Sequence, residues 1–231
     1  MLGAALRELS LVDCGISDAA VLRPKIAPCV KLEILDLGGN PGLDIATLPV
    51  FGAALRELLL WGCGIRDASA LGAKIAKTKL EKLNLSGNRL DVATLPVLGA
   101  ALRELLLVRC GIGNVAALGL KIAACALEKL DLSGNPRLYI ATLPVLGAAL
   151  RELHLVRCGI RDAAGLGLKI AACVKLEKLD LSGDGLDVAT LPVFGAALRL
   201  DPLLATRPWQ QQKGLTVWKK NSVSVEKKMP T

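Results

Sequence analysis

One sequence repeats along nearly the whole chain. The segment GAALRE begins at Gly3, Gly52, Gly99 and Gly147, and a shorter copy, GAALRL, begins at Gly195. Successive starts lie 47 to 49 residues apart. A period of this length predicts a stack of similar units in which each unit contacts only its neighbours. Functional residues are then expected at the few positions where the units differ.

Each unit of about 48 residues divides into two similar halves. Residues 102–112 read LRELLLVRCGI and residues 80–90 read LEKLNLSGNRL, so both follow L-x-x-L-x-L-x-x-(N/C)-x-L. The Leu-x-Leu step has the two-residue period of a strand, which places both leucines on one face. Strands of the same direction need a crossover between them, and the rest of each half supplies it.

This pattern resembles the leucine-rich repeat family over about residues 3–200, as eight coils of about 24 residues. The resemblance implies an α/β fold, a right-handed solenoid (horseshoe) with a concave parallel β-sheet and short convex helices. Alternating Cys-type and Asn-type coils are similar to the ribonuclease-inhibitor-like class, although the coils here are shorter than in that class. The family's role is to bind proteins, so the resemblance implies an interaction scaffold.

The two kinds of crossover have different sequences. In the first kind, apolar i, i+4 pairs such as Leu71 and Ile75 predict a helix packed on the sheet, with caps at Asp18, Asp67, Asn114 and Asp162. The second kind reads ATLPVLGAA, for which we expect a helix of about two turns capped by Thr94, with Pro96 in its first turn.

Asn and Cys alternate at the turn that follows each strand. In the family this Asn bonds the backbone of neighbouring coils, a role that Asp184 would fill less well because it lacks amide donors. The seven Cys also recur at fixed places, which indicates buried structural positions. The odd count, the absence of CxxC and the absence of a secretion signal favour a reducing, cytoplasmic location without disulfides or zinc.

Three positions of each strand are expected to point away from the core and to form rows across the sheet. The first row alternates acid and base, with Glu57, Lys82, Glu104 and Lys129 on successive strands. Opposite charges on adjacent strands stabilise a sheet, so we interpret this row as structural.

The next two rows carry the main candidate site. Leu59, Trp61, Leu106 and Val108 predict an apolar cluster on the concave face. Trp is enriched in protein interfaces, and a charged rim around an apolar patch is typical of a docking site. The competing interpretation is that a strongly hydrophobic scaffold tolerates exposed Leu and Val at these positions without any binding role. The full predicted partner-binding set is Glu57, Leu59, Trp61, Glu104, Leu106, Val108, Arg109, His154, Val156 and Arg157.

His154 is the only histidine, and it is expected between Asp131 and Asp180 in its row. We favour a solvated surface triad over a pH-sensitive contact or a weak metal site. No nucleophile–base pair and no phosphate-binding glycine loop is visible in the sequence, so we expect no enzyme, no cofactor and no metal site.

Two domains are expected, a repeat array over residues 1–200 and a basic, disordered tail over residues 201–231. The tail holds six basic and two acidic residues, half of the net charge of +8. Because basic residues elsewhere alternate with acids, we expect no nucleic-acid binding. No apolar run is long enough for a membrane span. Neither end has the polar composition of a capping repeat. Three explanations stay open, a fragment of a longer array, end-to-end association or a faulty gene model, and we favour the first and the last.

The sequence therefore favours a protein-binding scaffold that acts through its concave face. Two alternatives stay open. One is a regulator of a small GTPase, similar to leucine-rich-repeat activators of GTP hydrolysis. The other is a structural fragment of a larger receptor or adaptor with no activity of its own, which the near-identity of residues 99–146 and 147–194 favours.

Overall fold

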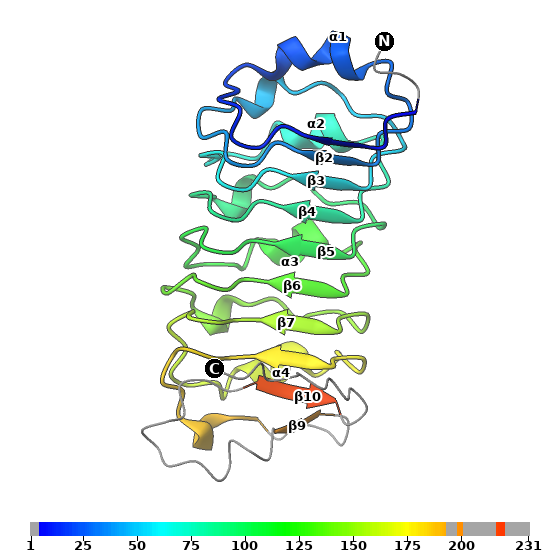
Figure 1. Ribbon diagram of the computed structural model, residues 1–231. Coiled ribbons are helices and arrows are strands. Elements are labelled where there is room, and N and C mark those ends of the chain that lie inside the picture. The colour runs from blue at the N-terminus through cyan, green and yellow to red at the C-terminus, as the bar shows by residue number, and fades with distance from the viewer. Residues whose placement is uncertain (1–4, 193–197, 201–215, 220–231) are drawn as a thin grey trace, which may run out of the picture.

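The computed structural model describes residues 5–192, 198–200 and 216–219, the last two ranges as backbone only. Eight short parallel strands stack in chain order in one sheet (Figure 1). They are β1 (Glu8–Ser10), β2 (Ile34–Asp36), β3 (Glu57–Leu59), β4 (Lys82–Asn84), β5 (Glu104–Leu106), β6 (Lys129–Asp131), β7 (Glu152–His154) and β8 (Lys178–Asp180). The predicted parallel solenoid is confirmed.

The predicted register is also confirmed. Leu83 of β4 pairs with Leu58 on one side and Leu105 on the other, and the same alignment holds from β1 to β8. From β2 to β8 the leucines of the Leu-x-Leu step, such as Leu83 and Leu85, are fully buried and form one continuous core, against which the partly buried Leu9 and Leu11 pack. Burying one leucine contributes about 1.5–3 kcal/mol relative to leaving it exposed. The repeated leucines therefore hold the stack together.

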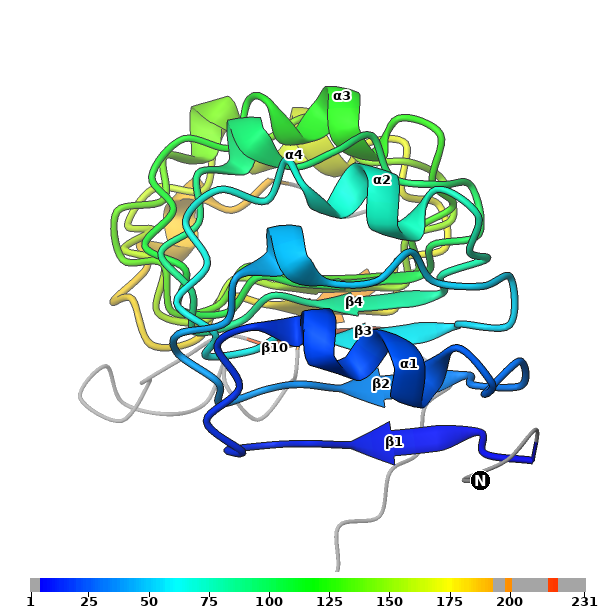
Figure 2. The ribbon, with the colours of Figure 1, turned by 90° about the horizontal axis from the view of Figure 1, so that it is seen from above.

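The short helices lie on one side of the sheet, behind the strands of Figure 1 and above them in Figure 2. In the first kind of crossover they are α1 (Arg23–Ile26), α2 (Leu71–Ile75), α3 (Leu118–Ile122) and α4 (Leu166–Ile170). Three of them begin and end on the predicted apolar pair. We call the opposite face of the sheet, which none of these helices covers, the open face.

The predicted caps of these helices were wrong in detail. Only Asp18 caps a helix directly, the 3₁₀-helix η1 (Ala19–Leu22). Asp67, by contrast, accepts from the backbone N–H of Ser69 at 2.8 Å, while α2 begins two residues later with no side-chain cap. The carboxylate bonds locally, in a turn that precedes the helix.

The second kind of crossover also differs from the prediction of a two-turn helix. It holds single 3₁₀ turns, η2 (Ile45–Thr47), η3 (Val92–Thr94), η4 (Ile140–Thr142) and η5 (Val188–Thr190). Leu95 has an extended ψ of 137° because the residue before a proline is kept out of the helical region. Asp91 is the cap, whereas the Thr94 hydroxyl accepts from Ala68 of the preceding coil.

Asn and Cys residues form the expected ladder between coils. The side-chain amide of Asn88, which is 1% exposed, donates to the carbonyls of Leu60 and Leu85 at 2.9 and 2.8 Å. In the alternate coils the thiol of Cys110 donates to Leu85 at 3.2 Å. Asp184 only accepts, from the N–H groups of Cys158 and Gly159, as its lack of amide donors predicts.

Beyond β8 the sheet continues in a different way. Strand β10 (Thr216–Lys219) pairs antiparallel with β8, and β9 (Leu198–Leu200) pairs antiparallel with β10. The prediction of a disordered tail falls mostly on residues outside the described ranges. For residues 216–219, however, the backbone is a strand at the end of the array. The boundary near residue 200 stays a prediction.

Candidate functional site

The open face carries the three predicted rows. Strand pairing places Glu57, Lys82, Glu104 and Lys129 side by side in the first row. Lys82 pairs with Glu57 at 3.4 Å, and Lys129 pairs with Glu152 at 3.5 Å. Ion pairs of half-exposed side chains contribute about 1 kcal/mol or less each. The row therefore neutralises itself, in line with the structural interpretation.

Trp61 lies in the third row with a feature that the sequence did not reveal. A methyl group built on Gly38, the residue before it in that row, would lie 2.1 Å from Cε2 of Trp61. The indole ring therefore covers the Gly38 backbone, and Trp61 is half-buried. Other coils carry Val or Ser at these positions, so the Gly–Trp pair belongs to coils 2 and 3 alone.

The predicted apolar cluster is divided in the structure. Asn84 lies between Leu59 and Leu106 in its row, and its side chain accepts from the N–H of Ser86 at 3.0 Å. Ser86 in turn accepts from the N–H of Val108. Leu59, Leu106 and Val108 are all half-buried. The open face thus offers two apolar pairs, separated by one polar strand and about 10 Å apart across two strand spacings.

His154 occupies its predicted row position between Asp131 and Asp180. Its imidazole, however, contacts Glu152 of its own strand, with Nε2 3.0 Å from Oε2. Both aspartates instead accept from backbone N–H groups two residues further along the chain. Partial burial raises the pKa of Glu152, but the His154 hydrogen bond and Lys129 outweigh it, so that pKa is lowered overall.

Val156, Arg109 and Arg157 lie at the end of the open face. Val156 is half-buried in the row of Trp61 and Val108, and the two arginines are exposed at the next position. That position has a positive φ in every coil that the structure describes, and Arg109 and Arg157 adopt φ of 54° and 52°. Most other coils place Gly there. The arginines therefore border the candidate site in a backbone conformation that favours glycine.

The described residues offer little for catalysis or metal binding. No group of three or more His, Cys, Asp or Glu among them is arranged to hold a metal ion. Among the described residues, His154 is hydrogen-bonded to Glu152 and not to a serine or cysteine that could act as a nucleophile. Burial raises the pKa of the thiols of Cys110 and Cys158 to about 11 and about 12, so they are protonated at neutral pH.

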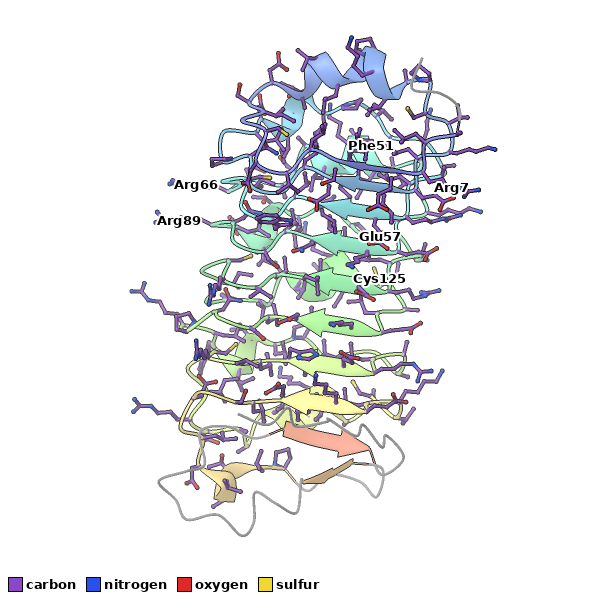
Figure 3. The ribbon with its side chains drawn as sticks, viewed as in Figure 1. Arg7, Phe51, Glu57, Arg66, Arg89 and Cys125 are labelled. Carbon is purple, nitrogen blue, oxygen red and sulfur yellow. The ribbon has the colours of Figure 1, made fainter. Side chains whose placement is uncertain are left out.

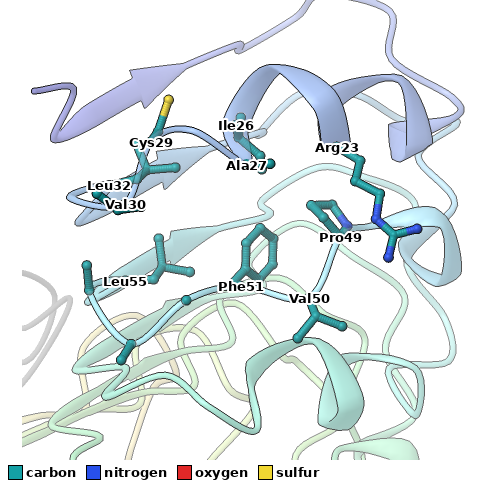
Figure 4. A pocket seen from close by; sticks show the side chains of 13 residues that line it. Arg23, Ile26, Ala27, Cys29, Val30, Leu32, Pro49, Val50, Phe51 and Leu55 are labelled. Carbon is teal, nitrogen blue, oxygen red and sulfur yellow. The ribbon is translucent and has the colours of Figure 1, made fainter. Parts of the chain in front are cut away.

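Three cavities lined by described residues lie on the helix side of the sheet. The first has a volume of about 500 Å³ and lies between α1 and residues 49–55. Figure 4 shows Ile26, Phe51 and Leu55 around it. Equivalent cavities of about 390 and 270 Å³ recur in the next two units. Because they repeat with the scaffold and are lined mainly by apolar side chains, we attribute them to coil packing.

Comparison with known proteins identifies the motif. The family model for the leucine-rich repeat matches residues 79–100, which span β4 and the crossover after it. No curated protein matches the chain. With the stacked parallel strands, this match establishes a leucine-rich-repeat solenoid. Proteins of this kind are in general non-enzymatic and bind other proteins. Among the described residues, no helix is long and apolar enough to cross a membrane.

Proposed function

We propose that this chain is a protein-binding scaffold whose partner docks on the open face around Trp61 and Leu106. The observation that carries the proposal is the Trp61–Gly38 pair, because both residues depart from the repeat at adjacent positions and fit one another. A scaffold position would keep the small or branched residue of the other coils. Trp placed on a solvent-facing sheet is the kind of residue that dominates binding energy in interfaces.

The neighbouring residues supply the rest of a docking surface. Leu59 ends β3 two residues before Trp61, while Leu106, Val108 and Val156 occupy the equivalent outward positions in later coils. Glu57 and Glu104 lie on one side of these residues. Arg109, Arg157 and His154 border them towards the ends of β5 and β7. A half-buried apolar centre with a charged border resembles the composition of transient protein interfaces.

The test compares Trp61→Asp with Val97→Asp in capture of partners from a cell extract. Val97 is 69% exposed on the helix side and serves as the matched control. The proposal expects Trp61→Asp to abolish capture of a specific protein while the chain still unfolds cooperatively on heating, and Val97→Asp to retain capture. Retention by Trp61→Asp would place the binding site elsewhere.

The finer predictions from the sequence enter here as proposals. The ribonuclease-inhibitor-like subclass rests on the alternation of Cys110-type and Asn88-type coils. A cytoplasmic location rests on Cys63, Cys110 and Cys158, whose thiols form no disulfide within the described residues. If the captured partner is a small GTPase, and its rate of GTP hydrolysis rises when the chain is added, the chain acts as a GTPase regulator. A purely structural fragment is the outcome if neither variant nor the unaltered chain captures any protein.

A further inference from the structure

The two edges of the sheet differ in how their arginines are used. At the edge where the strands begin, Arg7, Arg56, Arg103 and Arg151 each pair with a glutamate of a neighbouring coil. Their partners are Glu33, Glu81, Glu128 and Glu177. This edge is therefore a neutral ladder.

At the other edge, where the strands end, the arginines have no such partners among the residues that the structure describes. Arg66 and Arg89 extend outwards there, on the side opposite Arg7 in Figure 3. In the coils of β5, β6 and β7 this edge carries Arg109, Arg137, Arg157 and Arg161, all exposed. None of these four has an ion pair or a side-chain hydrogen bond with any residue that the structure describes. We call these four residues and Tyr139 the arginine edge.

Acidic residues are also absent from the arginine edge where other coils have them. The 3₁₀ turns of the second crossover are capped by Asp44, Asp91 and Asp187, but η4 begins after Tyr139, which makes no side-chain cap. In the coil of β5, Asn114 likewise replaces the Asp found in the other units. In the loops that follow β5, β6 and β7 (residues 107–117, 132–142 and 155–165), Asp162 is the one acidic residue against four arginines, a net charge of +3.

Tyr139 is exposed over 66% of its surface, in the same loop as Arg137. Its backbone N–H donates to Gly113 of the preceding coil at 2.8 Å, and Arg137 packs against the same glycine. The Cγ atom of Arg109 lies 2.6 Å from where a Cβ on Gly134 would be, so this side chain leans over the coil of Arg137. Arg109 thus leans towards the coil that carries Arg137 and Tyr139, and Arg157 leans in the same way over Gly183 of the next coil.

Arg109 and Arg157 are held there against the preference of the backbone. A side chain at φ near 54° costs about 1–2 kcal/mol, and glycine avoids this cost at the equivalent position of most coils. Such a conformation is kept where the side chain has a use. Tyr and Arg are also the residue types, with Trp, that most often anchor interfaces.

We propose that the arginine edge binds an acidic, extended segment of a protein partner, with guanidinium groups and the Tyr139 hydroxyl donating to its carboxylates. The surface is limited in length, which favours a short segment. Beyond the arginine edge, the side of the sheet where the strands end carries Asp13, Asp18 and Asp44 in the first two coils and Asp184 and Asp187 in the last. These carboxylates repel a long polyanion such as nucleic acid at both ends. The proposal does not depend on the open face, because Arg137, Arg161 and Tyr139 lie outside it.

The chain itself supplies substitutions that preserve the fold. Arg109→Gly and Arg157→Gly copy Gly62, Arg137→Gly copies Gly42, and Tyr139→Asp copies Asp44, each from the equivalent position of another coil. Arg66→Ser, which copies Ser17, removes one charge from the same edge outside the three coils and is the matched control. All variants are made in the full chain, and their melting temperatures are compared first.

The experiment measures fluorescence anisotropy of a labelled peptide of about ten glutamates, with a Gly-Ser peptide of equal length as the neutral probe. We expect the glutamate peptide alone to bind, with an affinity that falls as salt rises. Each guanidinium removed should weaken binding about two- to fivefold. The triple variant, which combines Arg109→Gly, Arg137→Gly and Arg157→Gly, should therefore bind the peptide at least several-fold more weakly, and so should Tyr139→Asp. Arg66→Ser should bind it like the unaltered chain.

Three results would overturn the proposal. The first is equal weakening of peptide binding by Arg66→Ser and Arg137→Gly, because binding would then follow the net charge of the chain. No weakening by either variant has the same force, because binding would then rest on the basic residues beyond position 200. The second is that a ten-nucleotide single-stranded DNA binds more tightly than the glutamate peptide and that the triple variant abolishes this binding. The arginine edge would then be a nucleic-acid site. The third is a dimer in sedimentation that the triple variant converts to monomer, which would make the occupant a second copy.

Discussion

The Asn ladder predicts a large, pH-dependent effect of a very small change, Asn88→Asp. In the folded chain the amide of Asn88 donates to the carbonyls of Leu60 and Leu85, and its oxygen accepts from the N–H of Ile65 at 2.9 Å. The carboxylate of Asn88→Asp still accepts from the N–H of Ile65, but its second oxygen replaces the amide nitrogen and faces the carbonyl oxygens of Leu60 and Leu85. It is also confined to a site that is 1% exposed.

The magnitude follows from the bonds that are lost. The buried Leu60 carbonyl is left without a donor, which costs about 1–3 kcal/mol. The Leu85 carbonyl keeps only the weaker thiol donor of Cys110, so the total loss is roughly 2–5 kcal/mol. This is a large fraction of the roughly 5–15 kcal/mol that stabilises a typical domain. Asp184 is tolerated at the equivalent position because it is partly exposed and accepts two N–H groups.

The sign of the pH dependence is fixed by burial, which disfavours the charged carboxylate and raises the folded-state pKa of the introduced carboxyl group above its unfolded value. The folded variant then holds a proton that the unfolded chain releases, so the free energy of unfolding falls as pH rises above about 4. We expect the variant to be closest to the unaltered chain near pH 4 and most destabilised at pH 7.

The assay is urea unfolding followed by circular dichroism at both pH values. Asn84→Asp is the matched control, because the same chemical change on the open face copies the aspartates of β2, β6 and β8. It should change the free energy of unfolding by less than about 0.5 kcal/mol. Equal losses for the two variants, or a loss for Asn88→Asp that is the same at both pH values, would refute the role assigned to the ladder.

Three further predictions follow from buried or close-packed side chains. At pH 8 a thiol reagent should modify exposed Cys14 first, whereas Cys110 and Cys158, with pKa values of about 11 and about 12, should react only after unfolding; rapid reaction of either would contradict their burial. Gly38→Ala should displace the Trp61 ring and shift tryptophan fluorescence to longer wavelength, at a cost of about 1–3 kcal/mol, and an unchanged spectrum would disprove the packing. His154→Ala should raise the pKa of Glu152 in an NMR titration, because the hydrogen bond that lowers it is removed; a pKa that stays in place would leave Lys129 as its cause.

The strands and their register were predictable because they depend on a strict local period. Each Leu-x-Leu step is a two-residue pattern, and the spacing of about 24 residues aligns every strand with the next, so Glu57 and Lys82 could be paired from the sequence alone. The crossovers were less predictable. Several polar residues near the ATLPVLGAA segment can cap a turn, and the structure uses Asp91 for this and bonds Thr94 to another coil.

The candidate site was predictable only in its rows. Which side chains point outwards follows from the strand period, but whether Trp61 stands free or lies over Gly38 depends on contacts between coils. Tyr139 and Arg137 were missed because the strand period says nothing about loop positions. Their signal was present, since Tyr139 stands where three other units have Asp. The pairing of residues 216–219 with β8 has no periodic signal and could not have been inferred.

The most direct test of the docking proposal places a photo-crosslinking amino acid at position 106 on the open face or at position 97 on the helix side. Each chain is irradiated in a cell extract, and covalent adducts are identified by mass. The proposal predicts a discrete adduct from position 106 that Trp61→Asp abolishes, and none from position 97. A specific adduct from position 97 alone, or no adduct from position 106, would contradict binding at the open face.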